Sequence, residues 1–112
     1  MQKFEYRTPR YHVDLPVILA LDSAHLSGRC KEISKDGMMI HMRESAPPDA
    51  CGTVTVSYRE KSLQLPVSVV HNGKGQLGLK FLFESDNDRS ALEHLVSLVA
   101  AAMGQPGPRL VR

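Results

Sequence analysis

Two short polar segments hold the side chains of this chain that are best suited to bind a ligand. The first, residues 6–10, carries Arg7 and Arg10 with Pro9 between them. Proline favours an extended backbone at its own position and at the one before it. An arginine guanidinium donates parallel hydrogen bonds, which suits both phosphate oxygens and the O6/N7 edge of guanine. The pair therefore points to an anionic ligand, and guanine is a base it can recognise.

The second segment, residues 32–37, has the spacing acid-x-Ser-x-x-Gly through Glu32, Ser34 and Gly37. We expect a turn in which Gly37 takes a positive φ and backbone N–H groups face outward. The Glu32 carboxylate can accept from the N1–H and N2–H₂ edge of guanine, which the arginines do not use. Alone, such a turn is usually structural and an arginine pair near a terminus is usually solvated. Together, in this order, they predict a site for a purine dinucleotide carrying two negative charges.

Composition describes one small domain with an aliphatic core. The chain has 112 residues, 42% of them hydrophobic, and a net charge of +2, which is too mild for a DNA or RNA partner. Cys30 and Cys51 are expected to be free and in or near the core. No apolar run has the length of a membrane span, and no signal peptide is recognisable. We expect a cytoplasmic location, either as a separate protein or as the cytosolic domain of a larger membrane protein.

Catalytic chemistry has little support in the sequence. The five histidines are scattered, and no Cys/His cluster has metal-ligand spacing. Neither cysteine has a recognisable base, and no glycine-rich loop joins a strand to a helix. The sequence therefore predicts no enzyme activity, no catalytic residue, no metal and no cofactor.

Hydrophobic alternation with period two dominates the chain up to residue 83 and predicts strands. The expected strands cover residues 13–21, 26–33, 38–42, 53–57, 63–69 and 77–83. The period then becomes helical, from a run of N-capping residues at 85–88 to Gly104 and Pro106. Six strands without intervening helices predict an antiparallel barrel or sandwich closed by one helix. Pro16 and Pro66 must then lie at sheet edges or bulges, because proline donates no ladder hydrogen bond.

The two polar segments together resemble the RxxxR and (D/N)xSxxG signature of PilZ domains. The resemblance runs from Tyr6 to Met103 and includes the helix. Leu15-Pro16-Val17 resembles the family's first strand, and Leu63 to Val70 its penultimate strand. Residues 77–81, Leu-Gly-Leu-Lys-Phe, resemble its LG-(V/L)-(K/R)-F strand. The arrangement is similar to the PilZ module of bacterial cellulose synthases.

This resemblance implies an all-β fold, a six-stranded antiparallel β-barrel with one C-terminal α-helix. It implies a flexible arginine arm at 1–12, the barrel with its closing helix at 13–103 and a disordered tail at 104–112. The implied function is that of a non-catalytic bacterial receptor for the second messenger cyclic di-GMP, which acts on a protein partner or a parent protein. The ligand-binding residues implied are Arg7, Arg10, Glu32, Ser34 and Gly37. Further candidates for ligand contact are Tyr6, Lys35, Asp36 and His71.

The chain departs from the family motif at two positions. Tyr6 stands where the first arginine belongs, with Arg7 one residue later, and Glu32 replaces Asp or Asn. One residue of displacement turns an extended side chain to the opposite side, although a flexible arm allows Arg7 to swing back and Tyr6 to stack on a base. The alternative function is therefore a degenerate PilZ adaptor, which binds no nucleotide and acts by protein–protein contact, as some members do in type IV pilus assembly.

Overall fold

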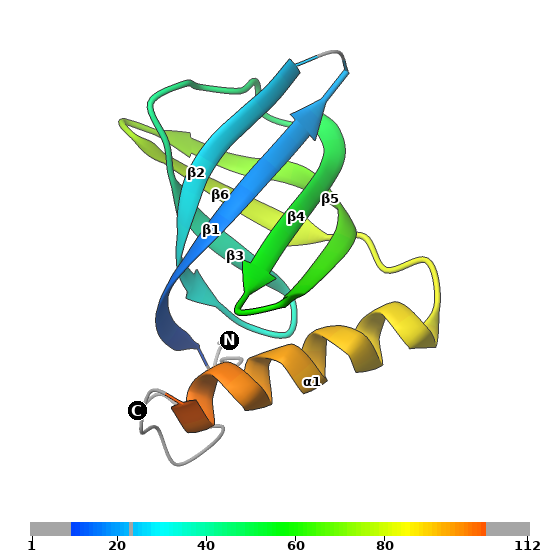
Figure 1. Cartoon of the computed structure of the whole chain (residues 1–112). Helices are drawn as coiled ribbons and strands as arrows, with labels where there is room; N and C mark the ends of the chain where they lie inside the picture. Colours follow the sequence, from blue (N-terminus) through cyan, green and yellow to red (C-terminus); the bar gives the residue numbers. More distant parts are fainter. Residues whose placement is uncertain (1–9, 23, 103–112) are drawn as a thin grey trace, which may run out of the picture.

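The computed structural model describes residues 10–22 and 24–102, which form a closed barrel and one helix (Figure 1). Neighbouring strands are antiparallel in the order β1-β2-β3-β6-β5-β4, which closes on itself. The expected six-stranded antiparallel β-barrel with one C-terminal helix is confirmed. The elements are β1 (Tyr11–Leu21), β2 (Ala24–Ile33), β3 (Gly37–His41), β4 (Cys51–Tyr58), β5 (Lys61–Gly73), β6 (Gln76–Phe81) and α1 (Asp86–Ala102).

The period-two alternation places one apolar face of the strands inside the barrel. In β1, buried and outward-facing residues alternate along the strand. The barrel interior is filled by aliphatic side chains, among them the fully buried Leu19, Ile40, Val54, Leu65 and Leu77. A small barrel filled in this way holds a packed core rather than a ligand cavity. A ligand site must therefore lie on the outer surface.

Both strand prolines lie where one of their two ladders ends. The β1–β4 ladder runs from Val17 to Ala20, so Pro16 stands just beyond it. The β5–β6 ladder begins at Val67, so Pro66 stands just beyond that one. Proline has no N–H to donate, and these positions spare the barrel a missing hydrogen bond. The expectation of sheet edges or bulges is wrong, because the barrel is closed and the register shifts of these strands lie elsewhere, between His12 and Leu15 and between Val69 and His71.

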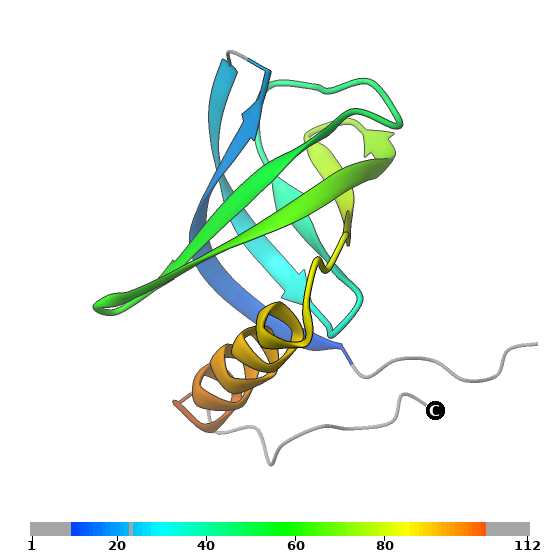
Figure 2. The same cartoon turned by 90° about the vertical axis from the view of Figure 1, so that its right-hand side faces the viewer.

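Helix α1 lies across one end of the barrel (Figures 1 and 2). The Asp88 backbone N–H donates to Ser85 Oγ at 3.3 Å, and the Glu84 N–H donates to Asp88 Oδ2 at 3.2 Å, so the helix starts where the sequence predicts. Gly104 and Pro106, expected to end the helix, and the expected tail at 104–112 lie outside the described residues. The buried face of α1 consists of Leu92, Leu95, Val96, Val99 and Ala100.

The start of β1 differs from the sequence prediction. Tyr11 and His12, expected in a flexible arm, are the first residues of β1 and pair with β2. Tyr11 is buried, and the loss of solvent raises the pKa of its hydroxyl. This buried ring explains why the strand starts two residues early; residues 1–9 of the expected arm lie outside the described residues.

The two cysteines also differ from each other. Both are free, as predicted, but only Cys30 belongs to the core, and Cys51 is exposed. Burial raises the pKa of the Cys30 thiol to about 12. The expectation that Cys51 lies in or near the core is wrong, because its position at the start of β4 faces solvent.

Candidate functional site

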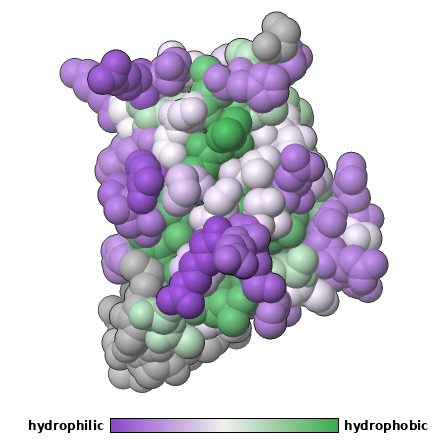
Figure 3. Space-filling model, in the orientation of Figure 1, coloured by the Kyte–Doolittle hydropathy of each residue, from purple (hydrophilic) through white to green (hydrophobic). Residues whose placement is uncertain are grey.

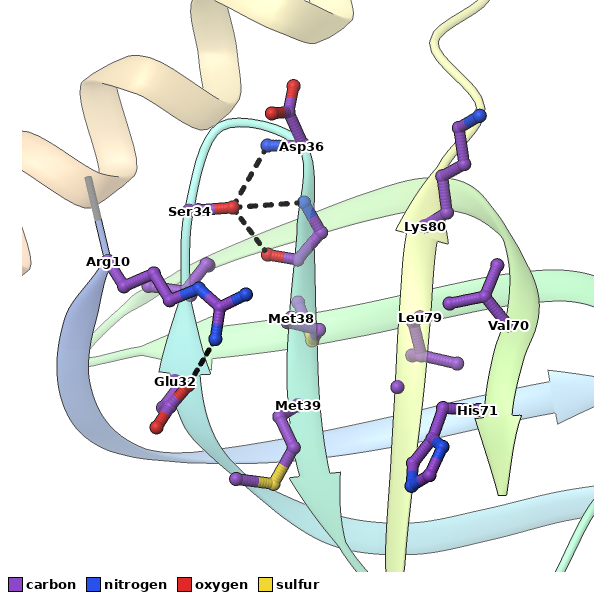
Figure 4. A pocket seen from close by; sticks show the side chains of 13 residues that line it. Arg10, Glu32, Ser34, Asp36, Met38, Met39, Val70, His71, Leu79 and Lys80 are labelled. Atoms are coloured by element: carbon purple, nitrogen blue, oxygen red, sulfur yellow. Dashed lines mark hydrogen bonds and ion pairs between the residues drawn. The ribbon is translucent and has the colours of Figure 1, made fainter. Parts of the chain in front are cut away.

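A pocket of about 860 Å³ lies on the outer surface of β3, β6 and β5, beside the turn between β2 and β3 (Figure 4). Lys35 belongs to that turn but does not line the pocket, and Tyr6 and Arg7 lie outside the described residues. The structure thus brings most of the described candidates together on one surface. The sequence-predicted residues that line the pocket are Arg10, Glu32, Ser34, Asp36, Gly37 and His71.

Arg10 and Glu32 form an ion pair at the rim of this pocket. Arg10 directly precedes β1, and its Nη1 lies 3.5 Å from Glu32 Oε1 on β2. The other carboxylate oxygen of Glu32 lies 3.8 Å from His12 Nδ1. The Arg10 side chain is 62% exposed and that of Glu32 is 26% exposed, so solvent screens this single long contact. A ligand phosphate would have to compete with the Glu32 carboxylate for Arg10.

Ser34 shapes the turn between β2 and β3. Its Oγ accepts from the backbone N–H groups of Asp36, at 3.1 Å, and Gly37, at 3.3 Å. Its own N–H donates to the Gly37 carbonyl oxygen at 2.9 Å. The expectation of outward-facing N–H groups is therefore wrong for these two residues, because the Ser34 hydroxyl draws both inward (Figure 4).

Gly37 is required by a close approach of strands rather than by backbone conformation. Among the glycines of the described ranges, the positive φ belongs to Gly75 and not to Gly37, so that prediction is wrong. A Cβ on Gly37 would overlap the carbonyl oxygen of Leu79 in β6. The neighbouring Asp36 carbonyl accepts from the Phe81 N–H at 2.9 Å. The turn is thus held against the end of β6 and presents a fixed edge to the pocket.

Four outward-facing residues that line the pocket were not among the ligand-binding residues expected from the sequence. They come from the outward positions of β3, β5 and β6 and are Met39, Val70, Gly78 and Lys80. Val70 is 57% exposed, the highest value among the large exposed hydrophobic side chains of the described region. The adjacent pair Val69-Val70 breaks the alternation of its strand, and this was the signal available in the sequence.

The described ranges offer little for other chemistry. No three His, Cys, Asp or Glu side chains within residues 10–22 and 24–102 gather into a group that could hold a metal ion. In the same part of the chain, no helix has the length and apolar character needed to cross a membrane. The absence of catalysis and of cofactors stays a prediction.

The comparisons with known proteins agree with the barrel. The sequence profile of the PilZ domain matches residues 5–98. The fold is similar to the PilZ domain of CeSA from a cellulose-synthesizing bacterium, with 18% identity, a TM-score of 0.66, and coverage of 84% of this chain and 97% of that one. An uncharacterized Legionella protein has 17% identity and a TM-score of 0.65, with coverage of 86% of this chain and 98% of that one.

The Bacillus subtilis inhibitor of motility, MotI/DgrA, gives a TM-score of 0.71 at 13% identity, over 95% of this chain and 54% of that one. The present chain therefore corresponds to about half of that protein. A comparison with functionally curated proteins gave no match. The profile match covers most of the sequence, and the chain belongs to the PilZ domain family.

Proposed function

We propose that this chain is a non-catalytic receptor domain for cyclic di-GMP. The observation that supports the proposal most is the shared pocket, where Arg10 from the start of β1 meets the Glu32–Gly37 turn in a PilZ domain. These segments are more than 20 residues apart in sequence, as the separation of 22 between Arg10 and Glu32 shows. Their convergence on one surface fits a ligand that needs both.

In this proposal the motif residues divide the ligand between them. Arg10 exchanges the Glu32 carboxylate for a ligand phosphate, and the released carboxylate accepts from the Watson–Crick edge of a guanine. Arg7 and Tyr6 reach the same ligand from the arm. One screened ion pair is thus replaced by two charge-assisted contacts to the ligand in a partly desolvated site, which are the stronger contacts.

A second candidate, a protein-binding adaptor without nucleotide, is favoured by one observation. Among the pocket-lining residues, the positive charges of Arg10 and Lys80 are balanced by Glu32 and Asp36. A ligand with two negative charges gains little from a neutral surface unless Arg7 adds its charge. In either case we place the domain in the cytoplasm, where it regulates a protein partner or a parent protein.

Calorimetric titration of the purified chain with cyclic di-GMP tests the proposal, with cyclic di-AMP as the matched control. We expect a dissociation constant near micromolar or somewhat lower, because ordering of the arm opposes binding. Affinity should fall as salt concentration rises, since the main contacts are to phosphate. Cyclic di-AMP should bind much more weakly, because it lacks the guanine edge groups. Absence of binding at millimolar cyclic di-GMP would reject the receptor and leave the adaptor.

A further inference from the structure

The bulge in β5 directs two consecutive side chains to the outer surface. β5 and β6 pair as Val69↔Leu79 and then His71↔Gly78, so Val70 is an extra residue without a partner in β6. Val69 points into the core, whereas Val70 and His71 are both exposed and line the pocket. Bulges often occur beside functional sites, where they redirect a side chain. Here the bulge gives the pocket an apolar group that regular alternation would not supply.

A bare stretch of backbone lies beside Val70. Gly78 is paired with Met39 on one side and His71 on the other, which makes a row across three strands. Strands lie about 4.8 Å apart, so Met39 and His71 stand about 10 Å from each other with only backbone between them. A Cβ at residue 78 would lie 3.1 Å from His71 Cβ and 3.8 Å from Val70 Cγ2. Glycine therefore keeps open a shallow floor with apolar walls.

This floor differs chemically from the motif residues beside it, where Glu32 of β2 pairs with Met39. Arg10, Glu32 and the turn supply charges and hydrogen-bonding groups, which recognise phosphates and the edges of a base. A base also has two apolar faces, and these need aliphatic, sulfur or ring contacts. In Figure 4, Met39 and His71 lie on either side of β6, away from Ser34 and Asp36, with Glu32 on the other side of Met39.

We propose that Met39, Val70 and Gly78 form a seat for the face of one purine ring, with the His71 imidazole at its margin. The inference rests on the proposed function and assigns a role to residues outside the motif. The Val70 methyl groups and the Met39 thioether contact the ring face, and Gly78 lets the ring approach the β6 backbone. The seat contributes affinity through apolar contact and leaves base identity to the neighbouring polar residues of the motif.

Substitution of Val70 tests the seat, with Ile18 as the matched control. Both are exposed β-branched residues, at 57% and 46%. Ile18 lies on β1, which is separated from β6 by two strands in either direction around the barrel. Figure 3 shows the face on which β1 lies in Figure 1, with apolar and pale side chains along its middle and strongly hydrophilic ones across its lower half. Neither change touches the core, so Val70→Ser and Ile18→Ser should both keep the fold.

The readout is the dissociation constant for cyclic di-GMP, measured by calorimetry at several salt concentrations. Val70→Ser should weaken binding about tenfold, within the range for loss of a base-stacking contact. The salt dependence should stay that of the wild type, because no phosphate contact is lost. Met39→Ala should act in the same direction, and Ile18→Ser should change affinity by less than about twofold.

The possible failures are distinguishable. Wild-type affinity in both Val70→Ser and Met39→Ala would overturn the seat and leave the receptor function intact. A weaker salt dependence in Val70→Ser would also overturn it, because the loss would then act through phosphate contacts. If the wild-type chain itself binds no cyclic di-GMP, the proposed function fails and the seat fails with it.

Discussion

Two arginine–carboxylate contacts lie between β2 and the first part of the described chain. One joins Asp14 of β1 to Arg29 of β2, and the other joins Arg10, just before β1, to Glu32 of β2. Arg29 Nε lies 2.8 Å from Asp14 Oδ1, and Arg29 Nη2 donates to the Asp14 backbone carbonyl at 3.2 Å. Lys31 Nζ adds a contact to the same carboxylate oxygen at 3.1 Å. The Arg10–Glu32 pair has a single contact at 3.5 Å. The first cluster has several short contacts, whereas the second is loose.

The place of each ion pair in the barrel indicates what it does. The register of β1 and β2 shifts between His12 and Leu15, and Asp14 stands in this bulge, where it meets Arg29 and Lys31. None of these three charged residues lines the pocket, whereas both members of the loose pair do. A carboxylate with two short cationic contacts stabilises a local backbone shape. A single long contact at a pocket rim can exchange its carboxylate for a ligand phosphate at low cost.

The largest expected effect separates the two arginines. Arg10→Ala should weaken cyclic di-GMP binding by about 2–5 kcal/mol, because a phosphate in a partly desolvated site would lose its cation. Arg29→Ala removes from β2 an arginine of similar exposure, 50% against 62%, and should leave affinity within about twofold. Calorimetry on both variants measures the contrast. Equal affinities of Arg10→Ala and wild type would mean that the loose pair has no part in recognition.

The backbone amides near the two ion pairs should also respond differently to ligand, which hydrogen exchange can measure. Bound cyclic di-GMP should slow exchange of amides in residues 10–12 and 32–37, by up to about a hundredfold when ligand is at a hundred times its dissociation constant. Amides at residues 28–31, beside the Asp14 cluster, should change little. Mass spectrometry of exchanged peptides with and without ligand is the measurement. Protection of both segments to the same degree would show that the two clusters respond as one unit.

A change of carboxylate length should alter ligand binding at Glu32 but not at Asp14. Glu32→Asp withdraws the carboxylate from Arg10 by one methylene and restores the family residue, so affinity should rise by about 1 kcal/mol. Asp14→Glu is the matched change at the other cluster and should not alter affinity. Calorimetric titration of both variants with cyclic di-GMP measures the two affinities. Weaker binding by Glu32→Asp would mean that the longer side chain is fitted to this site.

The inward side of the barrel was more predictable from the sequence than the pocket. Every second residue of β1, such as Val17 and Leu19, is buried and apolar, and this alternation is visible in the sequence. Ser85 likewise indicates the helix start, because it caps the Asp88 N–H. The pocket depends on outward positions, whose neighbours are set by register and bulges. Contacts such as Arg10 with Glu32, or the exposure of Val70, depend on pairings between strands that are distant in sequence.

The smallest expected effect concerns the pH dependence of the tight cluster. Hydrogen bonds from Arg29 and then from Lys31 lower the pKa of Asp14 below its ordinary value of 3.8. A carboxyl group with a lowered pKa in the folded state stabilises the protein above its unfolded pKa, and this contribution is lost as pH falls through the folded value. The contribution is small, because the Asp14 side chain is 52% exposed and solvent screens it.

Denaturant unfolding of wild type and Asp14→Asn between pH 7 and pH 2 measures this contribution. The wild type should be slightly more stable down to about pH 4, and the difference should close at lower pH as Asp14 gains a proton. A difference that persists at pH 2 would mean that the Asp14 side chain acts through packing or neutral hydrogen bonds instead of charge. Glu32→Gln is the matched variant at the pocket. Since the contacts of its carboxylate to Arg10 and His12 are long, at 3.5 and 3.8 Å, this variant should unfold close to wild type, while it still alters the response to cyclic di-GMP.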